Sequence, residues 1–273
     1  MAIDIGGTKT LMTCFEDDGQ PGASQRFATN QDYNGFLGDL ATAYAALGSP
    51  SVVAAGVAAP GRINRAEGVG VSFGNLAWSN VPLGHDVGQL LNCPVYLDND
   101  ANLAGLSEAR LVINEFKRVL YVTISTGIGS GFVVNGVIDQ DMQDAEGGKQ
   151  VVLREGHLVT WESFASGKAI VKRFGAPASQ INDPAIWQQI SQDFASGLLS
   201  LNAVLQPEVI VLGGGVSTHF NKFGDMVLTE MVKFNTPMTP TPVLRPAQRP
   251  EEAVVYGCFE LAKDLHGKTP ATS

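Results

Sequence analysis

Two segments of this chain, about 120 residues apart, share one unusual pattern. Residues 2–15 read AIDIGGTKTLMTCF and residues 120–136 read LYVTISTGIGSGFVVNG, each an apolar run, a glycine-and-threonine turn and a second apolar run. A third apolar run, VIVLGGGVS at 209–217, also leads into glycines. Each of the first two segments predicts a strand, a tight turn and a second strand. Because glycine allows the backbone to approach a ligand closely, three such turns favour ligand binding over a purely structural role.

Strands and helices alternate along the chain twice. Strands are expected over 2–5, 10–15, 51–61, 94–100 and 207–215, with a second hairpin over 119–138 and an extended loop or edge strand over 236–250. Helices are expected over 32–48, 81–92, 101–111, 161–174, 183–206 and 251–265. This order predicts an α/β protein of two duplicated lobes. The expected lobes are 1–110 and 111–251, with the helix 252–265 packing back on the first lobe and the tail HGKTPATS loose.

Composition narrows the possible partners. Hydrophobic residues make up 44% and charged residues 16% of the chain, which indicates a globular protein. A net charge of −9 argues against nucleic acid or an anionic membrane as the main partner. Cys14, Cys93 and Cys258 lie far apart and form no CxxC pair, so no disulfide framework is indicated. Without an apolar run of ~18–20 residues or a signal peptide, a cytoplasmic location is expected.

The residues of the first turn suit phosphate. Successive N–H groups of a glycine turn form a nest that binds oxyanions, and Thr8 and Lys9 add a hydroxyl donor and a cation. Asp4, beside the turn, is expected to hold Mg²⁺ through water. Two such turns, one per lobe, are expected to bind one polyphosphate from both sides. Neither is a Walker A loop, and the G-x-G of the second turn lies in a hairpin rather than between a strand and a helix.

The motifs DIGGTKT, LDNDANLAGLSEA, YVTISTGIGSGFVVNG, WESFASG and VIVLGGGVS, in this order and spacing, resemble the ROK family (repressors, open reading frames, kinases) of the actin-like ATPase and hexokinase superfamily. The resemblance extends from residue 2 to about residue 263. It implies two RNase-H-like lobes with a nucleotide and sugar cleft between them. It also implies an ATP- and Mg²⁺-dependent kinase that phosphorylates a small-molecule hexose or N-acetylhexosamine, and a homodimer.

The resemblance also assigns roles to single residues. The nucleotide-binding positions are Asp4, Gly6, Gly7, Thr8 and Lys9 in the first phosphate loop, Thr126, Gly127 and Gly129 in the second, and Gly213, Gly214 and Gly215 in the adenosine loop. The sugar-binding positions are Asn75, Asn99, Asp100, Glu146 and Glu162. Asp100 would be the general base, with an ordinary pKa of ~3.9. The alternative for LDNDAN is a strand end with a helix cap, and for Glu162 an acid at a helix start.

The chain departs from the family pattern at one segment. Members usually carry GEIGH followed by a cysteine-rich zinc segment, whereas this chain reads AEGGK with Lys149 at the histidine position and no cysteine between Cys93 and Cys258. We therefore expect no zinc site. Lysine donates hydrogen bonds but accepts none, so a Lys149 that contacts the sugar is expected to change the sugar preference from that for glucose. The alternative is that Lys149 is a solvated loop residue. Because the phosphate loop begins at Asp4, the helix-turn-helix domain of family repressors is not expected. One alternative is a non-catalytic sugar or nucleotide sensor. The other is an enzyme of the same superfamily that acts on something other than a hexose or uses a donor such as polyphosphate instead of ATP.

Overall fold

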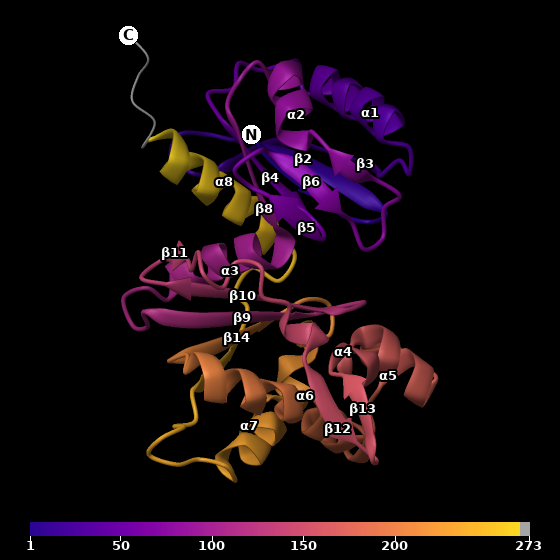
Figure 1. The fold of residues 1–273 in the computed structure, drawn as a ribbon, viewed down its shortest axis with the longest axis vertical. Coiled ribbons are helices and arrows are strands. Elements are labelled where there is room, and N and C mark those ends of the chain that lie inside the picture. Colours follow the sequence, from indigo (N-terminus) through magenta and orange to yellow (C-terminus); the bar gives the residue numbers. More distant parts are fainter. Residues whose placement is uncertain (268–273) are drawn as a thin grey trace. The chain divides into compact units, whose positions relative to one another are not determined.

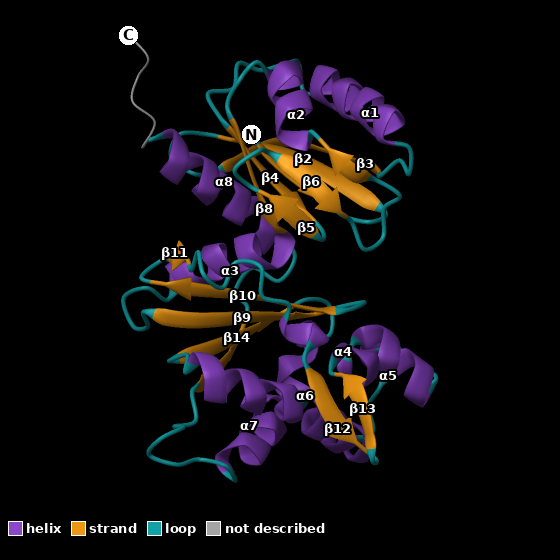
Figure 2. Ribbon diagram, in the orientation of Figure 1, coloured by secondary structure: helices purple, strands orange, loops and turns teal. Residues whose placement is uncertain are grey.

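The computed structural model describes residues 1–267, which form two compact units. The first unit comprises Met1–Ser107 together with the chain from Glu252 onward, and the second comprises Glu108–Glu251. Figure 1 labels their helices and strands along the chain, and Figure 2 shows that each unit contains a sheet and several helices.

The first unit is built on a five-stranded sheet with the order β3-β2-β1-β4-β8. Its strands are β1 (Ala2–Ile5), β2 (Lys9–Phe15), β3 (Pro21–Ala28), β4 (Ala55–Ala59) and β8 (Val95–Asn99). The first three strands pair antiparallel, whereas β4 and β8 run parallel to β1. A smaller antiparallel sheet contains β5 (Arg62–Asn64), β6 (Val69–Ser72) and β7 (Ser79–Val81). The helices of the first unit are α1 (Tyr33–Ala46), α2 (Leu83–Leu91) and α8 (Ala253–His266), and α3 (Asp100–Leu111) begins in this unit and ends in the second.

The second unit repeats the same design with the strand order β11-β10-β9-β14-β15. Its strands are β9 (Arg118–Ile124), β10 (Ile128–Val134), β11 (Val137–Ile138), β14 (Val209–Gly213) and β15 (Val243–Pro246). Again the hairpin strands are antiparallel and the last two strands are parallel to the central one. The helices are α4 (Glu162–Ala165), α5 (Gly167–Phe174), α6 (Pro184–Leu205) and α7 (Gly224–Val232), and a separate hairpin contains β12 (Val151–Arg154) and β13 (His157–Thr160). Short 3₁₀ turns are η1 (Gly147–Lys149), η2 (Ala178–Gln180) and η3 (Ser217–Lys222).

Small residues in β4 allow close packing at the centre of the first unit. The strand reads AGVAA and is buried at every position, as expected of a parallel strand covered on both faces. A Cβ on Gly56 would lie 2.0 Å from the carbonyl oxygen of Cys258 in α8. The Cys258 thiol also lies 3.5 Å from the carbonyl oxygen of Ile3 in β1. Glycine at position 56 therefore permits α8 to lie directly on the β1–β4 pair.

The α/β class, the duplication and the expected helices are confirmed by these elements. The stretch 161–174 is two helices rather than one, because the Ser166 hydroxyl accepts a hydrogen bond from the Ala169 amide and begins α5 there. The strands β3, β5, β6, β7, β12 and β13 were not predicted. The tail prediction concerns mainly residues 268–273, which lie outside the described residues. Within residues 1–267, no helix is long and apolar enough to cross a bilayer.

Candidate active site

The first glycine turn, residues 6–8, directs its carbonyl groups toward one wall of the first unit, the segment of Thr29 and Gln31. The Thr29 hydroxyl donates to the Gly6 carbonyl at 2.8 Å, and the Thr29 amide donates to the Thr8 carbonyl at 3.0 Å. The Gln31 amide donates to the Gly7 carbonyl at 3.4 Å. Because a trans peptide directs its C=O and N–H groups in opposite directions, the amides of Gly7 and Thr8 face away from this wall. This is the orientation that an anion-binding nest requires.

Asn75 lies against this turn, although 68 residues of sequence separate it from Gly7. It belongs to the loop between β6 and β7 and is exposed. A Cβ on Gly7 would lie only 2.7 Å from the Asn75 Cβ atom. The absence of a side chain at Gly7 therefore lets the loop that carries Asn75 approach the turn.

Asn99 and Asp100 occupy the junction between β8 and α3. The Ala101 amide donates to both side chains, at 2.9 Å to Asn99 Oδ1 and 2.8 Å to Asp100 Oδ1. The Asn99 amide group also donates to the Gly61 carbonyl at 3.4 Å. The helix-cap interaction that the sequence left as an alternative is thus present in the structure. The other carboxylate oxygen of Asp100, Oδ2, takes no part in the helix cap.

Asp100 lies close enough to Asp4 to affect the pKa of its carboxyl group. Burial, followed by the negative charge of Asp100, raises the pKa of Asp4 from 3.8 to about 7, and Arg26 acts in the opposite direction. Burial also raises the pKa of Asp100, against the hydrogen bond from the Ala101 amide. The ordinary pKa expected for Asp100 from the sequence is therefore corrected upward, because burial disfavours the charged carboxylate.

The donor set around Asp4 fits a magnesium ion bound largely through water. A cation would relieve the repulsion between the Asp4 and Asp100 carboxylates, and hard carboxylate oxygens are the ligands Mg²⁺ prefers. Among residues 1–267, no three His, Cys, Asp or Glu side chains cluster so as to hold a metal ion. Binding by one or two carboxylates, with waters and substrate phosphates, is the usual mode for Mg²⁺.

The second unit brings its two glycine turns side by side. The β9–β10 turn, residues 125–127, follows Ile124, whose carbonyl accepts a hydrogen bond from the Val216 amide at 3.0 Å. Gly214 has φ +82°, and a Cβ there would lie 2.6 Å from the Ile124 carbonyl oxygen. The parallel pairing of β9 and β14 places the ends of both strands at one sheet edge. Open α/β sheets bind ligands at this edge, the carboxyl end of their parallel strands.

Glu162, the first residue of α4, lies over the second glycine turn. Its Oε2 atom accepts a hydrogen bond from the Ile128 amide at 3.4 Å, and a Cβ on Gly127 would lie 3.1 Å from the same oxygen. Its Oε1 atom forms an ion pair with the Lys149 ammonium group. The sequence left Lys149 as either a sugar donor or a solvated loop residue, and the structure pairs it with a predicted sugar ligand. Glu146 lies just before η1 and is exposed.

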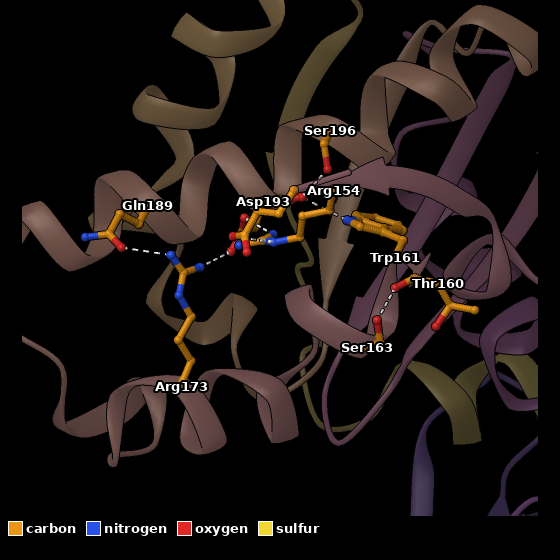
Figure 3. A network of polar contacts seen from close by, with 9 residues as sticks. Arg154, Thr160, Trp161, Ser163, Arg173, Gln189, Asp193 and Ser196 are labelled. Atoms are coloured by element: carbon orange, nitrogen blue, oxygen red, sulfur yellow. Dashed lines mark hydrogen bonds and ion pairs between the residues drawn. The ribbon is translucent and has the colours of Figure 1, made fainter. Parts of the chain in front are cut away.

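A polar network centred on Asp193 supports the segment that carries Glu162 (Figure 3). Asp193, in the middle of α6, accepts from Arg154 of β12 at 2.5 Å and from Arg173 of α5 at 2.6 Å. The Asp193 carbonyl accepts from the indole N–H of Trp161 at 2.9 Å. Trp161 is completely buried. One aspartate thus ties the β12–β13 hairpin, α5 and the residue before Glu162 to α6.

Within the first unit, the structure brings together the first turn, Asn75, and the β8–α3 junction with its link to Asp4. Within the second unit, it gathers the turns at 125–127 and 213–215 with Glu162 and Lys149. Sequence reasoning missed the pairing of Lys149 with Glu162 and the role of Asp193 in α6. No local signal distinguishes Asp193 from any other polar residue of a helix, so only packing reveals it.

Two sheets with one strand order, each headed by a glycine turn, are the actin-like ATPase fold. The ROK family model matches residues 1–265, so the chain belongs to the ROK family.

The relatives are sugar kinases by name. A fructokinase of Lactococcus lactis subsp. cremoris is 29% identical over 153 residues, and the match spans only about half of either chain, 52% of each. An N-acetylmannosamine kinase of Vibrio cholerae is 28% identical over 271 residues, covering 88% of this chain and 93% of the relative. The crystal structure of a ROK glucokinase from Streptomyces griseus in complex with glucose and AMPPNP superposes with a TM-score of 0.78. At 24% identity it covers 96% of this chain and 98% of its own, which shows the shared fold.

Proposed function

We propose that this protein is an ATP-dependent sugar kinase that transfers the γ-phosphate of ATP to a hydroxyl of a hexose or N-acetylhexosamine. The relatives are named as kinases of fructose and N-acetylmannosamine, and the structural neighbour binds glucose with an ATP analogue. These names favour a catalyst over a sensor. A kinase that uses ATP would act in the cytoplasm, and a homodimer is part of the same proposal.

The observation that carries the proposal is the position of Asp100. A sugar hydroxyl is a poor nucleophile at neutral pH, so a base must accept its proton as the new P–O bond forms. Asp100 lies at the start of α3 with one oxygen bound to the Ala101 amide, beside the candidate sugar ligand Asn99. Because burial raises the pKa of this carboxyl, it is a stronger base than an exposed aspartate. Asp100 is therefore the residue that takes the proton.

The phosphates would be held by the glycine turns. The amides of Gly7 and Thr8 face away from the protein wall, and Lys9 adds a cation beside them. In the second unit, the turn at 125–127, with Thr126 and Gly129, and the adjoining glycines 213–215 form the complementary phosphate and adenosine sites. Asp4 would hold Mg²⁺ through water, and the bound ion would neutralise negative charge on the phosphates. Phosphoryl transfer depends mainly on such positioning and charge stabilisation.

The acceptor site of the second unit would use the ion pair of Lys149 and Glu162, with Glu146 nearby in sequence. An ammonium and a carboxylate side by side offer a donor and an acceptor to the hydroxyls of one sugar. Because Lys149 stands at the position of the family histidine and no cysteine lies between Cys93 and Cys258, this site would work without zinc. Neither group specifies one hexose, which agrees with the range of sugars in the relatives' names.

The first test measures ADP release by the purified protein with ATP and Mg²⁺. The acceptors are glucose, fructose and mannose with the N-acetylated derivatives of their amino sugars, and polyphosphate replaces ATP in a parallel set. We expect sugar-dependent ADP release for at least one acceptor. Asp100→Asn should lower turnover at least ~10²-fold, because a general base contributes ~10²–10⁴-fold.

Asp18→Asn is the matched control. Asp18 is an exposed loop residue whose carboxylate accepts a bond from the Gln20 amide, and its variant should turn over like the wild type. A near-wild-type rate for Asp100→Asn would reject the assignment of the base. Sugar binding without turnover for any donor would instead support the sensor.

A further inference from the structure

Asp98, two residues before Asp100, holds three parts of the first unit together. Its side chain is 5% exposed. A single oxygen, Oδ1, accepts from Arg65 at 2.8 Å, from the Asn102 side chain at 2.8 Å and from the Asn99 amide at 2.7 Å. These donors come from the β5–β6 turn, the first turn of α3 and β8 itself. The carboxylate therefore binds the chain on both sides of Asp100.

Arg65 reaches Asp98 from a turn whose own position is fixed. The side-chain oxygen Oδ1 of Asn64 accepts a hydrogen bond from the backbone amide of Glu67 at 3.2 Å. The side-chain Nδ2 of Asn64 donates to the Glu67 carboxylate at 2.9 Å. The Gly84 amide of α2 donates to the Gly68 carbonyl at 2.8 Å, which ties the turn to that helix. The side chain of Arg65 is 19% exposed, so its ion pair with Asp98 is largely shielded from water. The Arg65 side chain is thus held in one position and is not a solvated charge.

The same pair connects two sets of candidate ligands. Arg65 lies in the turn between β5 and β6, and the loop between β6 and β7 carries Asn75. Asp98 belongs to β8, which carries Asn99 and leads into Asp100. The ion pair therefore relates the loop at the first glycine turn to the junction that holds the proposed base.

We propose that Arg65 and Asp98 are positioning residues for Asp100, holding the β8–α3 junction in the geometry in which Asp100 accepts the proton of the sugar hydroxyl. This rests on the proposed function. A shielded ion pair is weak evidence of a purely stabilising role, because the desolvation of both groups offsets much of their attraction. The ion pair fixes the orientation of the Asp98 carboxylate, because a carboxylate that receives three donors on one oxygen has little freedom to rotate or shift. A misplacement of about 1 Å in a catalytic group can cost on the order of 10²-fold in rate.

The test uses Arg65→Met, Arg65→Lys and Asp98→Asn in the full-length protein. Arg65→Met should lower kcat by about 10- to 100-fold while the KM for ATP stays within about twofold, since Asp100 is displaced and the glycine turns are not touched. Arg65→Lys keeps the charge without the planar fork and should recover part of the loss. Asp98→Asn retains an oxygen for Asn102 but not the ion pair, so it serves if Arg65→Met folds poorly. Arg62→Met, at an exposed position of β5 three residues earlier, is the matched control and should have the wild-type kcat.

A double-mutant cycle with Asp100→Asn separates positioning from general destabilisation. If Arg65 acts through Asp100, Arg65→Met should change the residual rate of Asp100→Asn by less than about twofold. The same fold-loss in both backgrounds would overturn the positioning role and leave the proposed function intact. A wild-type rate for Asp100→Asn alone would overturn the assignment of the base and the positioning role together. An unchanged kcat in Arg65→Met and Asp98→Asn would overturn the positioning role alone.

Discussion

Gly197→Ala tests whether the packing between α6 and Trp161 is as close as the structure indicates. A Cβ at position 197 would lie 2.1 Å from two atoms of the Trp161 indole and 2.6 Å from a third. Ordinary contacts between carbon atoms are about 3.5–4.0 Å long, so the ring or the helix must move by at least about 1.4 Å. Trp161 is completely buried and its N–H is bonded to the Asp193 carbonyl, so the ring has no free space to enter.

Two opposing effects set the size of the loss. Alanine is favoured over glycine in a helix interior by about 1 kcal/mol, which stabilises the variant. Overpacking of a well-packed core costs about 1–3 kcal/mol, and the upper end applies because both the ring and α6 are fixed by other contacts. We expect a net loss of about 2 kcal/mol in the free energy of unfolding. Since Glu162 follows Trp161 directly, the KM for the sugar should rise as well if Glu162 binds it.

Urea unfolding followed by tryptophan fluorescence measures the effect. Gly38→Ala is the matched control, because Gly38 is an exposed glycine in the interior of α1 with no atom within 4 Å of an added Cβ. It should receive the helix-propensity gain alone and become more stable by up to about 1 kcal/mol. If Gly197→Ala were as stable as Gly38→Ala, the close packing of Trp161 on α6 would be refuted.

Two further variants test buried carboxylates. Asp193→Asn leaves Arg154 and Arg173 without their shared negative charge. Because both arginines are partly exposed, we expect the free energy of unfolding measured in urea to fall by about 2 kcal/mol. Little change in this free energy would show that the network does not stabilise the fold. The pKa of Asp4 is raised from 3.8 to about 7, so the folded state binds this proton more tightly than the unfolded state and the wild type loses stability as the pH rises from about 4 to 7. Asp4→Asn has no such proton and, without Mg²⁺, should be more stable than the wild type above pH 7 by up to about 4 kcal/mol, with the difference vanishing near pH 4. A stability difference independent of pH would contradict this ionisation.

Patterns within a few residues were enough to predict most of the fold. The helix predicted over 183–206 is α6, because Asp183 caps it, Pro184 starts it and Gln206 ends it in the left-handed conformation. The proline-rich stretch 236–250 contains the edge strand β15, as its composition indicated. The repeated strand–turn–strand pattern likewise anticipated two sheets of the same order.

The strands that escaped prediction lack a local signal. β3 reads PGASQRFA and has few apolar residues, so it is a strand only because β2 supplies a hydrogen-bonding edge. The turn of the β12–β13 hairpin places both Glu155 and Gly156 at positive φ. Such turns usually contain Asn-Gly or Asp-Gly, so the Glu-Gly sequence did not predict this hairpin.

The sequence by itself determined the class of fold and the glycine turns, because helix caps, periodicity and turn chemistry act between near neighbours. The candidate ligands came from the resemblance of its motifs to the ROK family. Only the tertiary structure decided how those ligands are held. Arg65 reaches Asp98 across 33 residues, Arg154 reaches Asp193 across 39, and the burial that raises the pKa of Asp4 comes from packed elements rather than from its neighbours in the chain. A charge pair between distant residues has no periodicity, and its strength depends on the exclusion of water, which exists only once the chain has folded.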